Sequence, residues 1–77
     1  MSVQERVKEI LMDILDVEEK AIVPDATFIT DLGASSVDLV EIIAAVENHF
    51  DIEISDEEAQ QIRTVRALID FLKTKTS

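Results

Sequence analysis

Residues 31–38 read Asp31-Leu32-Gly33-Ala34-Ser35-Ser36-Val37-Asp38, and they bring the only glycine of the chain to the start of an apolar-patterned segment. Glycine favours a turn, and serine is common at a helix start because its hydroxyl oxygen accepts a bond from a backbone N–H. The stretch therefore predicts the junction of a loop with a helix. Two serines stand at this junction, although a helix has only one N-cap position.

Apolar residues continue at helical spacing from this junction to Phe50, which predicts a helix over 36–50. The stripe expected to be buried consists of Leu39, Ile42, Ile43, Val46 and Phe50. Val37, Val40 and Ala44 flank that stripe. A partly exposed apolar strip beside acidic residues is therefore expected on this helix.

The same spacing predicts helices on either side. An amphipathic helix over 2–15 comes first, and a long connection over 16–34 follows it. A short helix over 55–62 and a last helix that begins after Thr64 are expected downstream, before a polar tail over 73–77 that frays. Capping boxes support the first and third starts, because each serine is followed three residues later by a glutamate: Ser2 with Glu5 and Ser55 with Glu58.

No alternating strand pattern of useful length occurs along the chain. The sequence therefore predicts a single all-α domain over 1–77. Its architecture is a four-helix bundle of three longer helices and one short helix, with a long first loop.

Composition excludes several kinds of site. The chain has 77 residues, no cysteine and one histidine, so it offers no thiolate nucleophile and no Cys- or His-rich zinc site, and no metal is expected. No apolar run approaches the roughly 18 residues of a membrane span, and no signal peptide is visible, so a cytoplasmic protein is expected. Any thiol chemistry has to come from outside the polypeptide.

The net charge of −10 is concentrated in the middle of the chain. No Lys or Arg occurs between Lys20 and Arg63, where ten acids lie: Asp25, Asp31, Asp38, Glu41, Glu47, Asp51, Glu53, Asp56, Glu57 and Glu58. Nucleic-acid binding needs clustered bases and is not expected. A basic protein partner is the natural complement of such a segment.

The two adjacent serines can be assigned different roles. Ser35, with Asp38 three residues later, fits the N-cap, which leaves Ser36 at the first helical position with its hydroxyl free. Catalysis by Ser36 is disfavoured, because the only histidine, His49, lies 13 positions away on the same helix, roughly 20 Å at 1.5 Å per residue. Two interpretations stay open at this point: a plain helix start, or an attachment point for a phosphodiester, which a helix N-terminus favours.

Residues 31–42 closely resemble the motif of the acyl carrier protein family, usually Asp-Leu-Gly-Ala-Asp-Ser-Leu-Asp followed by a helix with Val-Glu-Leu. Similarity to the family extends along essentially the whole chain, without gaps. It includes residues 5–8, 26–28, 50–54, 56–59 and 64–66.

The resemblance implies a non-enzymatic, monomeric carrier that holds acyl groups as thioesters on 4′-phosphopantetheine attached to Ser36. The implied partners are a phosphopantetheinyl transferase and acyl-loading and acyl-processing enzymes of fatty-acid, lipid or polyketide-type biosynthesis, which dock through basic patches. The implied partner-binding residues are Val37, Asp38, Glu41, Glu47, Glu53 and Asp56. The residues implied to line an acyl pocket are Val40, Ile43, Val46, Ile54, Ile62, Leu68 and Ile69.

Two departures from the family pattern bear on specificity. Ser35 replaces the usual aspartate before the modified serine, and Ala44 and Asn48-His49 make the second helix smaller or less acidic than usual. These changes favour a specialised carrier over the main fatty-acid carrier. The alternatives to acyl carriage are an acidic helical interaction module without a prosthetic group and a carrier of amino-acyl or peptidyl groups.

Overall fold

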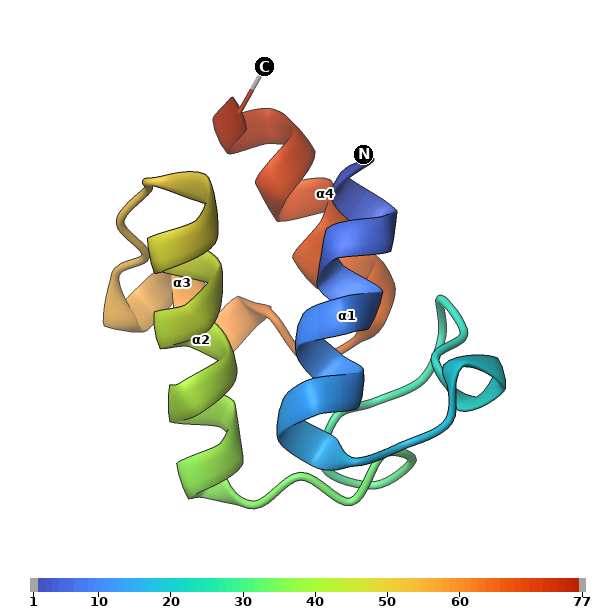
Figure 1. The fold of residues 1–77 in the computed structure, drawn as a ribbon. Coiled ribbons are helices and arrows are strands. Elements are labelled where there is room, and N and C mark those ends of the chain that lie inside the picture. The colour runs from blue at the N-terminus through green and yellow to red at the C-terminus, as the bar shows by residue number, and fades with distance from the viewer. Residues whose placement is uncertain (1, 77) are drawn as a thin grey trace.

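The computed structural model describes residues 2–76, which form four α-helices and one 3-10 turn (Figure 1). The helices are α1 (Val3–Leu15), α2 (Ser36–Phe50), α3 (Asp56–Gln61) and α4 (Val65–Thr76), and the turn is η1 (Glu19–Ala21). The predicted all-α bundle of three longer helices and one short one is confirmed. The turn η1 was not predicted.

The helices begin where the serine and threonine patterns predict. Capping boxes form at Ser2, Ser35 and Ser55, and the hydroxyl of Thr64 accepts the backbone N–H of Ala67 at 3.1 Å. The two longest helices end on aspartates with a left-handed backbone, at Asp16 and Asp51, both with φ of 55°. The start of each helix is therefore fixed by hydrogen bonds in its first turn, and α1 and α2 end at a change of backbone hand.

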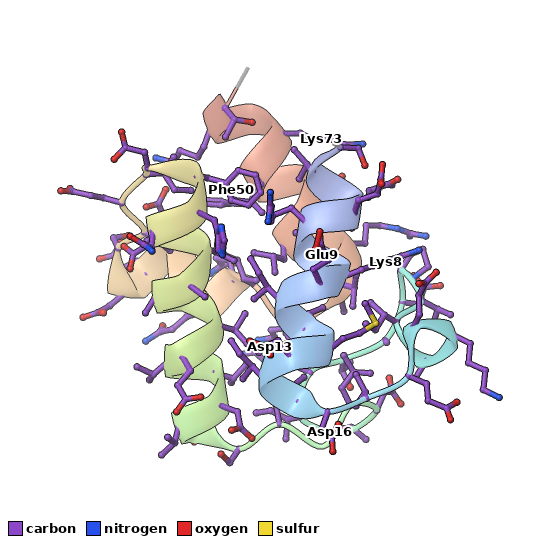
Figure 2. All side chains as sticks on the ribbon, in the orientation of Figure 1. Lys8, Glu9, Asp13, Asp16, Phe50 and Lys73 are labelled. Atoms are coloured by element: carbon purple, nitrogen blue, oxygen red, sulfur yellow. The ribbon has the colours of Figure 1, made fainter. Side chains whose placement is uncertain are left out.

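The core lies between the three longer helices. α1 runs antiparallel to α2 and packs against both α2 and α4, and the start of α1 and the end of α4 lie at the same end of the bundle (Figure 1). Figure 2 shows the charged side chains of Glu9 and Asp13 on the outer face of α1, whereas Phe50 lies between the upper parts of α2 and α4 in this view. The core residues are all apolar: Val7, Ile10, Leu11, Ile22, Ala26, Phe28, Leu32, Ala34, Ile42, Val46, Ile62, Val65, Leu68, Ile69 and Leu72.

The long connection between α1 and α2 packs on the bundle, as its apolar residues predict. Phe28 is only 2% exposed, and its N–H donates to the carbonyl of Arg63 at 3.1 Å. Thr27 and Thr64 form an isolated antiparallel bridge, and Val65 donates to the carbonyl of Ala26 at 3.1 Å. The connection is thereby joined to the segment between α3 and α4.

Two predicted helix ends need correction. α3 ends at Gln61, one residue early, because Ile62 leaves the helical conformation and is buried in the core. The predicted fraying from Lys73 is wrong for residues 73–76, which continue α4, while Ser77 lies outside the described residues. Lys75 stabilises this last turn, because its Nζ lies 3.3 Å from a Glu58 carboxylate oxygen and 5.5 Å from the centre of the Phe71 ring.

Glu58 therefore interacts with the start of α3, through Ser55, and with the last turn of α4, through Lys75. Its carboxylate accepts the backbone N–H of Ser55 at 3.0 Å, and this bond lowers the pKa of Glu58 below its ordinary value of 4.5. The ammonium of Lys75 lowers this pKa further, and partial burial opposes both effects. A carboxylate whose pKa is lower in the folded than in the unfolded chain stabilises the fold when it is ionised.

We predict that Glu58→Gln lowers the free energy of unfolding at neutral pH, because glutamine keeps the capping-box partner but removes the charge. The difference from the parent chain is expected in full above pH 4.5 and to disappear as the pH falls through the folded-state pKa of Glu58. Urea unfolding of both chains across this range measures the difference. A difference that is independent of pH would contradict the assignment.

Candidate functional site

The junction predicted from residues 31–38 is a tightly bonded turn in front of α2. Gly33 has φ of 71°, a left-handed conformation that glycine adopts without steric cost. The N–H of Ala34 donates to the carbonyl of the buried Phe28 at 2.8 Å. The position at which α2 starts is therefore fixed to the core through the backbone.

Ser35 is the N-cap of α2, as predicted. Its hydroxyl oxygen accepts the N–H of Asp38 at 3.1 Å, and the Asp38 carboxylate accepts the N–H of Ser35 at 3.0 Å. Aspartate thus completes a reciprocal capping box in which glutamate or glutamine is the usual partner. The capping function at this junction is fully supplied without Ser36.

Ser36 is the first residue of α2 and is exposed. Within residues 2–76 its hydroxyl has no hydrogen-bond partner. The residues at this position fit an attached phosphate, because the first turn of a helix presents unpaired N–H groups and the positive end of the helix dipole. His49 lies on the same unbroken helix, so it stays roughly 20 Å away and cannot serve Ser36 as a base.

An open groove of about 520 Å³ lies beside this helix start. Leu39, which follows Ser36 by three residues and so shares its side of α2, belongs to its wall. The groove is lined by Thr27, Phe28, Ile29, Thr30, Leu39, Ala59, Gln60, Ile62 and Arg63. The first connection, α2, α3 and the segment before α4 therefore meet around one mainly apolar hollow.

The residues implied for an acyl pocket are spread over different environments. Ile62 lines the groove, whereas Val46, Leu68 and Ile69 are buried in the core. Ile43 and Ile54 are half-buried against that core. Val40 is 68% exposed, because it follows Leu39 by one residue and is turned about 100° around the helix from the groove wall. The structure brings only Ile62 of this set to the groove.

The predicted partner-binding residues divide into two groups. Glu41, Glu53 and Asp56 are exposed, and Val37 is 67% exposed on α2. Asp38 and Glu47 are half-buried and also hold the backbone, since Asp38 completes the cap and Glu47 accepts the N–H of Ile54 at 2.8 Å. On α2, Glu41 lies one helical turn from Val37 and beside Val40, so an exposed acid adjoins exposed apolar surface there.

Two features of the site were not predicted from the sequence. Glu47 anchors the connection after α2, and its partner lies seven residues away, beyond any local capping spacing. Asp31 accepts the N–H of Thr27 at 2.8 Å, and its own N–H donates to the Thr27 hydroxyl at 3.2 Å. The bonds between Thr27 and Asp31 resemble those of a capping box, but the two residues are four positions apart where a capping box has three. The only sign of this pairing in the sequence is a threonine followed by an aspartate.

No group of three or more His, Cys, Asp or Glu side chains in residues 2–76 is placed to hold a metal ion. In the same part of the chain, no helix is long and apolar enough to cross a membrane.

We predict that Glu47→Ala destabilises the fold by about 1–3 kcal/mol, because it leaves the partly buried N–H of Ile54 without its acceptor. The matched variant Glu41→Ala, on the exposed face of the same helix, is expected to stay within about 0.5 kcal/mol of the parent chain. Denaturant unfolding of the three proteins gives both values. Equal effects of the two substitutions would refute a structural role for Glu47.

Comparison with known proteins identifies the family of this chain. The family described as phosphopantetheine attachment site matches residues 5–72. Acyl carrier proteins from two strains of Buchnera aphidicola subsp. Acyrthosiphon pisum, 5A and Tuc7, are each 53% identical to this chain over 74 residues, which cover 96% of this chain and 92% of the relative.

Solved structures show the same arrangement of helices. A solution structure from Anaplasma phagocytophilum, described as an acyl carrier protein, matches with a TM-score of 0.90 at 27% identity over 97% of this chain and 89% of that one. A structure from Mycobacterium tuberculosis with the same description matches with a TM-score of 0.89 at 28% identity, over 96% of this chain and 99% of that one. The chain therefore belongs to the acyl carrier protein family, and its cofactor is 4′-phosphopantetheine.

Proposed function

We propose that Ser36 is the residue that carries 4′-phosphopantetheine, through a phosphodiester on its hydroxyl oxygen. The observation that carries the proposal is the division of roles between two adjacent serines. Ser35 supplies the cap by reciprocal bonds with Asp38, and the exposed hydroxyl of Ser36 is left unused within the described residues. A transferase can therefore modify Ser36 without disturbing the cap that holds α2 in place.

The prosthetic arm supplies a terminal thiol that forms thioesters with acyl groups. The chain has no cysteine, so it provides no competing thiol of its own. The residues of the chain bind and orient: the first turn of α2 favours the phosphate by its dipole, and the groove beginning at Leu39 offers an apolar surface to the acyl group. The chain itself performs no catalysis in this proposal.

The acidic face of α2 and α3 is the surface that partner enzymes meet. Glu41, Glu53 and Asp56 are exposed there, and Val37 adds an apolar contact next to the attachment point. A net charge of −10 favours fast association with basic surfaces, such as those expected on a transferase and on acyl-processing enzymes. Asp38 and Glu47 contribute to this face mainly by holding its shape.

Family membership favours acyl carriage over a bare interaction module. The specialised role suggested by Ser35 stays a prediction. A cytoplasmic location and a monomeric state also stay predictions.

We predict opposite outcomes for the two serine variants. Ser36→Ala abolishes the mass increment of one phosphopantetheinyl group after incubation with a broad-specificity transferase and coenzyme A, yet changes stability little, because alanine is a good helix former. Ser35→Ala keeps the increment but destabilises the fold by about 1 kcal/mol through loss of the cap. Intact mass spectrometry and urea unfolding measure the two effects.

The same pair of variants also shows how the proposal fails. A mass increment that survives Ser36→Ala would exclude Ser36 as the attachment residue. A parent chain that gains no increment would exclude attachment altogether.

A further inference from the structure

One positively charged side chain, Arg63, lines the groove whose wall includes Leu39 of α2. Its backbone is fixed, because its carbonyl accepts the N–H of the buried Phe28 at 3.1 Å. Its Nε–H donates to the carbonyl of Gln60 at 3.3 Å, which holds the guanidinium against the last turn of α3. Arg63 is thus positioned from both sides of the groove.

The guanidinium of Arg63 has binding capacity left over. An arginine side chain has five N–H donors, and the bond to Gln60 uses one of them. Within residues 2–76 no carboxylate forms an ion pair with Arg63, whereas Arg66, three residues later, pairs with Asp25 at 3.2 Å. The two exposed arginines therefore differ in that only Arg63 faces the groove with unused donors.

Arg63 is also a single positive charge within an acidic segment of the chain. It is the only Lys or Arg between Lys20 and Arg66, a segment that holds ten carboxylates. An anionic group that enters the groove would be repelled by this segment and would lose hydration against the apolar residues Phe28, Ile29 and Leu39. A guanidinium at the edge of the groove offsets both the repulsion and the lost hydration, because it can bind a carboxylate through two parallel N–H bonds.

A plain hydrocarbon chain needs no such partner, since the apolar surface of the groove suffices for it. We propose that the groove accepts acyl groups that end in a carboxylate, and that Arg63 is the specificity-determining residue that binds this carboxylate. The inference rests on the proposed attachment at Ser36, which places the cargo beside the groove.

The test compares four chains: the parent, Arg63→Gln, Arg63→Lys and the matched control Arg66→Gln, which removes an exposed arginine that does not line the groove. Each chain is loaded in turn with a phosphopantetheine arm bearing an octanoyl group and an arm bearing the octanedioyl group, which has the same length and a free carboxylate. Intact mass confirms every loading. The rate of thioester cleavage by hydroxylamine, a neutral nucleophile, then reports how well the groove shelters the cargo, at low and at high salt.

We expect the octanedioyl thioester to be cleaved about two- to fivefold faster on Arg63→Gln than on the parent chain at low salt, the size of one partly exposed ion pair. High salt reduces this difference in rate. Arg63→Lys gives an intermediate cleavage rate, because lysine keeps the charge but not the paired N–H donors. Arg66→Gln is cleaved at the rate of the parent chain. The octanoyl thioester is cleaved equally on all four chains.

Equal cleavage of the octanedioyl thioester on parent and Arg63→Gln chains that are both fully loaded would overturn the inference and leave the attachment proposal intact. The same holds if Arg66→Gln accelerates cleavage as much as Arg63→Gln, because the effect would then come from total charge. A parent chain that shows no loading by mass would overturn attachment at Ser36 and the inference with it. Circular dichroism of the unloaded variants verifies that each is folded.

Discussion

The reciprocal bonds between Ser35 and Asp38 are the constraint on which the rest of this structure depends. They fix the residue at which α2 begins, and successive side chains along the helix are turned by about 100° from one another. With this start, Ile42 and Val46 face the core, Leu39 faces the groove, and Glu41 faces outward. The free hydroxyl of Ser36 is a direct consequence.

The cap is in turn held in place by the long first connection. Phe28 is the link, because its side chain is buried in the core, its carbonyl accepts the N–H of Ala34, and its N–H binds the carbonyl of Arg63. The bonds between Thr27 and Asp31 close the turn that carries Phe28 inward. Phe28 thereby connects the turn before α2, the groove and the segment before α4. These contacts explain why the connection between α1 and α2 is ordered although it contains no long helix.

Sequence reasoning located the helices and placed the cap of α2 at Ser35 correctly, because helical periodicity and capping depend on residues three or four positions apart. It missed what depends on tertiary contacts. Glu47, predicted as a docking acid, also accepts the backbone N–H of Ile54, and the tail after Lys73 is kept helical with the help of Glu58 on another helix. Periodicity identifies a buried face but not a hollow beside it, and of the residues that the family resemblance implied for an acyl pocket only Ile62 lines the groove. Arg63 went unnoticed as a groove residue for the same reason.

The central claim is that Ser35 caps the helix and Ser36 carries the prosthetic group. The most direct measurement is tandem mass spectrometry of the unmutated chain after loading, with cleavage before aspartates to release residues 31–37, which contain both serines. The account predicts the phosphopantetheinyl group on Ser36 in every modified peptide and none on Ser35. Fragment ions that place the group on Ser35, alone or in a mixture, would contradict it.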